Sequence, residues 1–273
     1  MGKQFDIKHY RVKPAKSFSF KDWNPGECRL SSKDSIEDSQ TLANLNERLD
    51  KLQDLLFATH KHKILLVLQG MDTSGKDGTI RHVFNTVDPL GVRVASFKAP
   101  TEDELDHDFL WRVHRQVPGD GEIVIFNRSH YEDVLIVPVH GWITPQECTR
   151  RYEVINAFEK LLSDNGTIII KCFLYISKSE QKARLEARLA DPEKRWKFRL
   201  GDVAERKLWK KYIQAYEDAL AATSTKHAPW HVVPANSKTE RNLIISNLLV
   251  QTLESLNMQY PEPDEDLSAV VVE

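Results

Sequence analysis

The stretch Ile64-Leu65-Leu66-Val67-Leu68-Gln69-Gly70-Met71-Asp72-Thr73-Ser74-Gly75-Lys76-Asp77-Gly78-Thr79 decides the fold. Its first half is a short, continuous apolar run, as expected of a central parallel strand that is covered on both faces. Its second half matches GxxxxGK, a glycine-rich turn that leads from a buried strand into a helix. The alternative is a turn that merely joins strand to helix.

Phosphate chemistry explains why these residue types occur together. Phosphate oxygens need closely spaced backbone N–H donors and a cation, and a glycine turn, a helix N-terminus and Lys76 supply them. We therefore predict a phosphate-binding loop. Its residues are Gly70, Thr73, Ser74, Gly75, Lys76, Asp77, Gly78 and Thr79.

Asp77 stands where the usual motif has a metal-binding Ser or Thr hydroxyl. Another group must therefore hold Mg²⁺, and a carboxylate inside the loop can reach a hydrated ion that bridges phosphates. We predict that Asp72 binds the metal, with Asp77 as a second candidate ligand.

Short apolar runs alternate with long helical patterns along the chain, which predicts an α/β three-layer sandwich with a mostly parallel, five-stranded sheet. The predicted strands are 64–68, 92–97, 122–126, 168–176 and 231–234, and the last helix spans about 239–256. We expect a single domain over 1–273, with an irregular arm at 1–35 and a loose tail at 261–273 that contains the acidic run Asp264-Glu265-Asp266. Residues 178–222 are predicted to form a lid of two long helices joined at Asp191-Pro192.

A second polar constellation follows the strand predicted at 122–126, and ligands bind at this edge of open α/β sheets. Asn127 occupies the position where many phosphate-binding proteins have a metal-orienting acid, Arg128 can clamp a phosphoryl group, and Glu132 is a plausible site acid. The alternative is a helix-capping cluster in which Asn127 or Ser129 is the cap and Glu132 pairs with a neighbour.

The lid segment is rich in cations. Residues 184–199 hold six basic side chains against three acidic ones, and Arg184 and Arg188 share one helix face. Lys197 and Arg199 lie in Arg195-Trp196-Lys197-Phe198-Arg199, where cations alternate with aromatic rings. Such a segment can line a path for a long phosphate chain; the alternatives are a solvated face or a single-strand nucleic-acid surface.

Composition narrows the classes of protein. With 273 residues, 41% hydrophobic content and a formal charge of -2, the chain is globular, and a general nucleic-acid or membrane binder is disfavoured. Three cysteines without metal-ligand spacing indicate a reducing compartment. No run approaches the ~20 apolar residues of a membrane span, so we expect a cytoplasmic protein without a nucleic-acid or membrane partner.

Five segments together resemble the polyphosphate kinase 2 family. They are 69–79, Phe109-Leu110-Trp111-Arg112-Val113-His114, Phe126-Asn127-Arg128-Ser129-His130-Tyr131-Glu132-Asp133, Lys194-Arg195-Trp196-Lys197-Phe198 and Ala228-Pro229-Trp230. The resemblance implies a thymidylate-kinase-like P-loop kinase with a helical lid. It also implies Mg²⁺, inorganic polyphosphate and a nucleotide as reactants, and a homodimer or homotetramer.

The resemblance also implies individual roles. Asp72 is similar to the family's P-loop metal acid, Lys76 to its phosphate lysine, Arg128 to its phosphate-contacting arginine, and Arg184 and Arg188 to its lid cations. Many relatives that use a single nucleotide level have Asp-Arg-Ser-Trp-Tyr-Asn at 127–132. The Asn and Glu version seen here resembles the class that accepts both AMP and ADP, so Glu132 is predicted to govern nucleotide-level selectivity.

The expected function is reversible, Mg²⁺-dependent transfer of a phosphoryl group from polyphosphate to AMP and ADP, which forms ADP and ATP. Catalysis is assigned to Asp72, Lys76 and Arg128, because phosphoryl transfer needs positioning and charge neutralisation and no nucleophilic side chain. The alternatives are an ATP-dependent nucleotide kinase and a non-catalytic module that binds phosphate polymers.

Overall fold

The computed structural model describes residues 5–263, 265, 270 and 272. Five strands pair in parallel in the order β2-β3-β1-β4-β5, which confirms the predicted sheet. Their bounds are β1 Lys63–Gln69, β2 Val92–Ser96, β3 Ile123–Asn127, β4 Thr167–Tyr175 and β5 Trp230–Pro234. The central strand β1 is buried from its second residue to its last, as its uninterrupted apolar sequence predicts.

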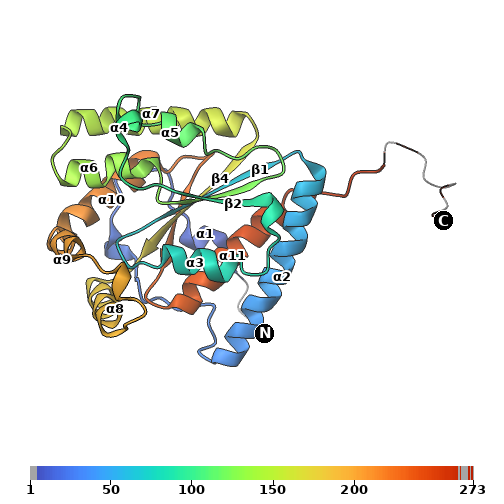
Figure 1. Ribbon diagram of the computed structural model, residues 1–273, viewed down its shortest axis with the longest axis horizontal. Coiled ribbons are helices and arrows are strands. Elements are labelled where there is room, and N and C mark those ends of the chain that lie inside the picture. Colours follow the sequence, from blue (N-terminus) through green and yellow to red (C-terminus); the bar gives the residue numbers. More distant parts are fainter. Residues whose placement is uncertain (1–4, 264, 266–269, 271, 273) are drawn as a thin grey trace.

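Helices cover both faces of the sheet and make the three layers visible in Figure 1. One layer contains α2, α3 and α11, and the other contains α6, α7 and α10 (Figure 1). The bounds of these helices are α2 Ser35–Thr59, α3 Lys76–Val83, α6 Ile136–Val139, α7 Pro145–Asp164, α10 Trp209–Thr223 and α11 Lys238–Glu254. The core lies between the layers, where α11 contributes Leu243, Ile244, Leu248 and Leu249.

Short elements connect the layers. They are α1 Ile7–Tyr10, η1 Phe20–Asp22, η2 Pro89–Gly91, α4 Glu102–Leu105, α5 Trp111–His114 and η3 His130–Val134. The segment before α2 lies over the body: Tyr10, Val12 and Phe20 are buried in the core. The buried carboxylate of Glu240, on α11, accepts hydrogen bonds from the backbone N–H groups of residues 29–31.

The prediction of two long lid helices is wrong in its second half. The segment contains α8 Lys178–Ala190, η4 Arg195–Lys197 and α9 Leu200–Lys207 before α10. The first helix does end before Asp191-Pro192, where the Asp191 side chain accepts from the N–H of Glu193 and starts a turn. The second helix is split at Leu208, because α10 buries Tyr216 and Leu220 in the core whereas α9 buries no side chain.

Part of the predicted tail, including Asp264 and Asp266 of its acidic run, lies outside the described residues. Residues 261–263 have no regular secondary structure. None of the helices formed by the described residues combines the length and apolarity that a bilayer span requires.

Candidate active site

The P-loop connects β1 to α3 at the carboxyl edge of the sheet, where the predicted strand-turn-helix is present. Gly70 and Gly75 have φ of 158° and 103°, and Thr73 also has a positive φ, so the chain turns sharply enough to enter the helix at Lys76. The N-cap of α3 is Gly75, which has no side chain to bond the first-turn amides. These N–H groups and the positive end of the helix are therefore available to an anion.

Lys76 is buried under the loop and folds back on it. Its Nζ donates to the carbonyl of Gly70 at 2.8 Å and lies 3.5 Å from that of Met71. Burial, reinforced by the nearby charge of Arg128, lowers the pKa of Lys76 to about 8. A phosphate at this position would replace two carbonyl dipoles by full negative charge, so it would favour the protonated amine.

Arg241 supports the P-loop from below, a role that sequence reasoning missed. This side chain, from α11, is 2% exposed, and its Nη1 points to the carbonyl of Ser74 at 3.4 Å. A Cβ at Gly75 would lie 2.0 Å from the same Nη1. Burial and the nearby Arg184 lower the pKa of Arg241 to about 10, and no carboxylate among the described residues pairs with it.

Several oxygens of the loop are buried yet make no hydrogen bond with the described residues. They are Asp72 Oδ2, Thr73 Oγ1, Ser74 Oγ and Thr79 Oγ1. Buried polar atoms are normally satisfied, so this concentration in one loop is the mark of a site for polar ligands. Within the described part of the chain, no three His, Cys, Asp or Glu side chains converge to hold a metal by themselves.

Asn127 and Asp77, the two departures from the usual pattern, contact each other. Asn127 Nδ2 donates to Asp77 Oδ1 at 2.8 Å, from the end of β3 to the first turn of α3. The carboxylate that is absent from the strand position is thus present on the helix opposite it. This pair and Asp72 are the oxygen donors near the loop that suit a hard cation such as Mg²⁺, which prefers few carboxylates plus phosphate and water.

The segment after β3 combines both interpretations of its sequence. Arg128 has a φ of 64° and is exposed, and its N–H donates to the carbonyl of Leu68, which places it beside the P-loop. Ser129 caps η3 by accepting from the N–H of Tyr131, and Glu132 pairs with Arg128 at 3.5 Å, as the capping alternative describes. Asp133 faces Arg151 of α7 at 3.4 Å and is tied to that helix.

The first lid helix, α8, is bound to the back of the loop. Arg184 donates to the carbonyls of Thr73 and Ser74 at 2.9 and 3.2 Å, and to those of Ala235 and Asn236. Its Nε pairs with Glu180 at 2.7 Å. In this conformation the guanidinium of Arg184 is therefore saturated by the protein and holds the P-loop in place.

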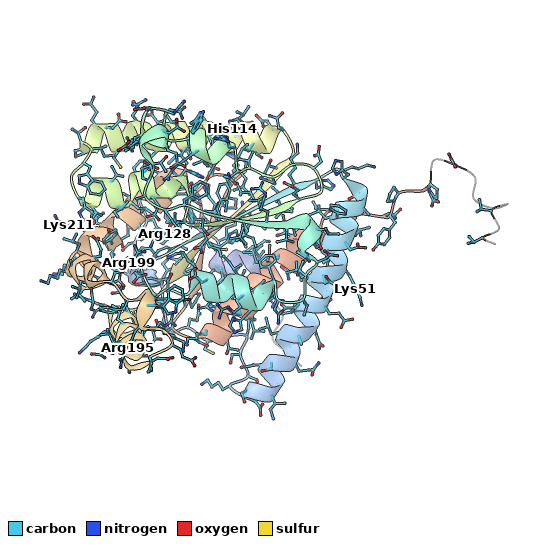
Figure 2. All side chains as sticks on the ribbon, viewed as in Figure 1. Lys51, His114, Arg128, Arg195, Arg199 and Lys211 are labelled. Carbon is cyan, nitrogen blue, oxygen red and sulfur yellow. The ribbon has the colours of Figure 1, made fainter. Side chains whose placement is uncertain are left out.

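Arg188, one turn further along α8, faces the site. Its Nη1 lies 3.8 Å from Asp72 Oδ2 and 3.7 Å from Asp202 Oδ2. Lys197 and Arg199 are not brought to the P-loop: the Lys197 amine lies over the ring of Trp196, and Arg199 is exposed at the start of α9. Figure 2 shows Arg195 and Arg199 on the lid and Arg128 near the centre of the molecule.

A buried polar network lies beneath η3. Lys171 of β4 donates to Glu159 of α7 at 2.6 Å, to the Tyr131 hydroxyl and to the carbonyl of Thr223. Both charged groups are fully buried, and the Lys171 amine also lies over the ring of Trp230. Tyr131 and Trp230 therefore belong to the scaffold that holds the segment after Arg128.

A five-stranded parallel sheet, a GxxxxGK loop with a buried lysine and a basic helical lid define the chain as a P-loop kinase. Residues 31–261 match the family described as Polyphosphate kinase 2 (PPK2). An AMP/ADP-polyphosphate phosphotransferase of Meiothermus ruber is 54% identical over 98% of this chain and 100% of its own length. An ADP-polyphosphate phosphotransferase of Rhodopseudomonas palustris is 47% identical over 79% of each chain.

The crystal structure of Polyphosphate Kinase 2 from Arthrobacter aurescens TC1 has the same fold. It matches with a TM-score of 0.92 and 45% identity, over 96% of this chain and 93% of that one. The chain belongs to the polyphosphate kinase 2 family and is a phosphotransferase of that type.

Proposed function

We propose that this enzyme transfers the terminal phosphoryl group of inorganic polyphosphate to AMP and to ADP, and that the reaction is reversible. The observation that carries the proposal is the P-loop itself, with Lys76 buried beneath it and unpaired oxygens around it. The Meiothermus ruber relative, which is similar over nearly the whole chain, supports both acceptors.

In the transfer step, an oxygen of the acceptor's terminal phosphate forms a bond to the end phosphorus of polyphosphate. The P–O bond to the rest of the chain breaks, and the shortened polyphosphate leaves with the electron pair. The transition state is loose, so the protein positions the partners and neutralises charge. Lys76 and the first-turn amides of α3 bind one phosphate group of the donor, and the Arg128 guanidinium binds the phosphoryl group that is transferred.

Phosphotransferases of this kind generally use a divalent metal ion, and we propose Mg²⁺. Asp72 supplies Oδ2, which is buried and makes no hydrogen bond with the described residues, and Asp77, oriented by Asn127, supplies a second carboxylate. The ion offsets phosphate charge and orients oxygens when bound. Arg188 sits 3.8 Å from Asp72 and is the lid cation best placed to meet the polyphosphate, with Lys197 and Arg199 further along the same segment.

Glu132 is proposed to set the nucleotide level. It is the carboxylate that contacts Arg128 directly, so it controls how much of the guanidinium faces a phosphate. A site that takes both AMP and ADP must bind acceptors whose phosphate groups carry different charges. The Glu132 carboxylate partly neutralises the positive charge that Arg128 presents to that phosphate.

The deciding experiment mixes purified protein, Mg²⁺ and long-chain polyphosphate with AMP or with ADP in separate reactions that lack ATP. We expect ADP and then ATP from AMP, and ATP from ADP. An ATP-dependent nucleotide kinase would yield no ADP from AMP, and from ADP it would make ATP only by disproportionation, with an equal amount of AMP and without any need for polyphosphate. A non-catalytic module would bind polyphosphate without turnover. Either result would refute the proposal.

We further propose a cytoplasmic homodimer or homotetramer. The thiols of Cys28, Cys148 and Cys172 are free, as suits a reducing compartment that holds nucleotides. The long helix α2 keeps Ile36 and Phe57 exposed and offers a surface for a second copy. Sedimentation equilibrium of the purified chain tests the assembly, and a monomer at micromolar concentration would contradict it.

A further inference from the structure

Gln69, the last residue of β1, lies fully buried directly before the P-loop. Its amide group satisfies all of its partners in one orientation. Oε1 then accepts from the N–H and from the hydroxyl of Ser129, both at 3.1 Å, and Nε2 donates to Oε1 of Glu132 at 3.1 Å. One side chain thus bridges the strand that leads into the P-loop and the segment that contains Arg128.

The two oxygens of Glu132 face different partners. Oε1 meets the Gln69 amide from the core, and Oε2 meets the Arg128 guanidinium at 3.5 Å from the side of the site. Because Gln69 occupies one oxygen, the carboxylate is held to a single-oxygen contact with Arg128. Without that restraint Glu132 could turn both oxygens to the guanidinium, which is the stronger, bidentate arrangement.

An amide is an uncharged group that can accept from Ser129 and donate to a carboxylate at the same time. A carboxylate at position 69 would face Glu132 at about the same separation, and two such groups do not both ionise near neutral pH. A thioether would fill the volume but could accept only weakly from the Ser129 N–H and could not donate to Glu132. The chemistry of this position is therefore constrained beyond its packing.

We propose that Gln69 is a positioning residue for acceptor selectivity: its amide fixes the Glu132 carboxylate, which in turn sets how Arg128 is presented to AMP or ADP. This inference rests on the proposed function, because it assumes that Glu132 discriminates the two acceptors. Gln69 itself touches no reacting atom.

The test compares kcat/KM for AMP with kcat/KM for ADP, with polyphosphate as donor. The proteins are the wild type, Gln69→Met, Glu132→Gln, Gln69→Glu and the double variant Gln69→Glu/Glu132→Gln, together with the control given below. Gln69→Met is expected to change the AMP-to-ADP ratio about tenfold, as the loss of a hydrogen bond to a charged group would. Gln69→Glu is expected to shift the pH profile, because the two carboxyls must share a proton.

The double variant exchanges the amide and the carboxylate and keeps both net charge and hydrogen bonding. We expect it to restore the pH profile of the wild type and to keep the altered ratio of Glu132→Gln, since the carboxylate has left the site. It also guards against a folding defect in Gln69→Met. Gln53→Met, which alters another buried glutamine on α2, is the matched control and should leave the ratio unchanged.

The outcomes separate the inference from the function on which it rests. If Glu132→Gln alters the ratio and Gln69→Met does not, the role of Gln69 is refuted and the role of Glu132 stands. If neither variant alters the ratio while both acceptors are still phosphorylated, both roles fail and the phosphotransfer function remains. If Gln53→Met changes the ratio as much as Gln69→Met, the effect is one of general packing and the inference is overturned.

Discussion

At the scale of single residues, the P-loop contains a buried charged amine that lowers the stability of the free protein. Lys76 is buried without a carboxylate in hydrogen-bond contact, and this burial lowers its pKa from 10.5 to about 8. Below pH 8 the folded chain therefore holds a charged amine in a place that disfavours it. A bound phosphate would compensate the buried charge of Lys76. The destabilisation of the free protein is then relieved on binding, and this relief contributes to the affinity for the substrate.

Replacing Lys76 by Met should therefore change stability and activity in opposite directions. Between pH 8 and 10.5, the Lys76 amine is protonated in the unfolded state and mostly neutral in the folded state. The variant should be more stable than the wild type by up to about 3 kcal/mol at pH 7, and the difference should vanish toward pH 10.5. Denaturant unfolding at several pH values measures it. The variant's kcat/KM should fall about 10²-fold or more.

The same pKa predicts the pH dependence of the wild type. A phosphate favours the protonated amine, so kcat/KM for polyphosphate should be high below pH 8 and fall as the pH rises through about 8. Binding of polyphosphate near pH 8.5 should take up protons, which titration calorimetry in two buffers of different ionisation enthalpy detects. A flat profile to pH 10 would show that Lys76 does not meet the phosphate.

Gly75 offers a second test at this scale. Its φ of 103° disfavours any side chain, and a Cβ would lie 2.0 Å from the buried Arg241 guanidinium. Gly75→Ala should lose both stability and phosphotransfer. Gly166→Ala is the matched control, because Gly166 has a φ of 87° but nothing within 4 Å of a Cβ. Gly166→Ala should lower the free energy of unfolding by roughly 1–2 kcal/mol, the penalty for a side chain in a left-handed backbone conformation, as measured by thermal unfolding. Equal losses in both variants would contradict the role of Arg241.

At the scale of elements, the site depends on how α7 and β4 hold η3. The pair between Glu159 and Lys171 crosses from helix to strand, and the Tyr131 hydroxyl joins it beneath the segment that follows Arg128. Because both charges are buried, removal of one leaves the other without compensation, which costs far more than the pair contributes as a whole.

Lys171→Met should therefore destabilise the protein by about 3–5 kcal/mol, measured by denaturant unfolding. The double variant Glu159→Leu/Lys171→Met should recover much of that loss, since no lone charge remains. Lys51→Met is the control: its pair with Glu47 is exposed to solvent, so its loss should change the stability far less than Lys171→Met does. A Lys171→Met protein as stable as the control would mean that Glu159 is neutral in the fold.

At the scale of the whole molecule, local patterns could be predicted and distant contacts could not. The strand before Gly70 and the turn that leads to Lys76 follow from a continuous apolar run and a fixed spacing, which act within about fifteen residues of chain. Arg241 contacts the P-loop from α11, which is far along the chain, so no local pattern indicates the contact. Lys171 lies in a strand, and nothing in its sequence context indicates that its amine is buried. The helix spacing predicts that Arg184 meets the substrate, whereas in this conformation it donates to four backbone carbonyls.

Charge is also distributed at this scale. The chain as a whole carries -2, yet residues 184–199 of the lid carry six cations against three acids. Figure 2 shows Arg195 and Arg199 on the lid and Lys51 on the opposite side of the molecule. A polyanion should therefore be drawn to one end only, and this attraction should weaken as salt shortens the range of the field.

Arg199→Gln should raise KM for polyphosphate about fivefold at low salt, the equivalent of roughly 1 kcal/mol. The difference from the wild type should shrink as ionic strength increases, because screening weakens the attraction that the wild type makes through Arg199 and that the variant already lacks. Lys51→Gln changes net charge equally on α2 and should leave KM for polyphosphate unchanged at every salt concentration. If the two variants raise KM alike, net charge and not the lid attracts the substrate, and residues 184–199 are only a solvated face.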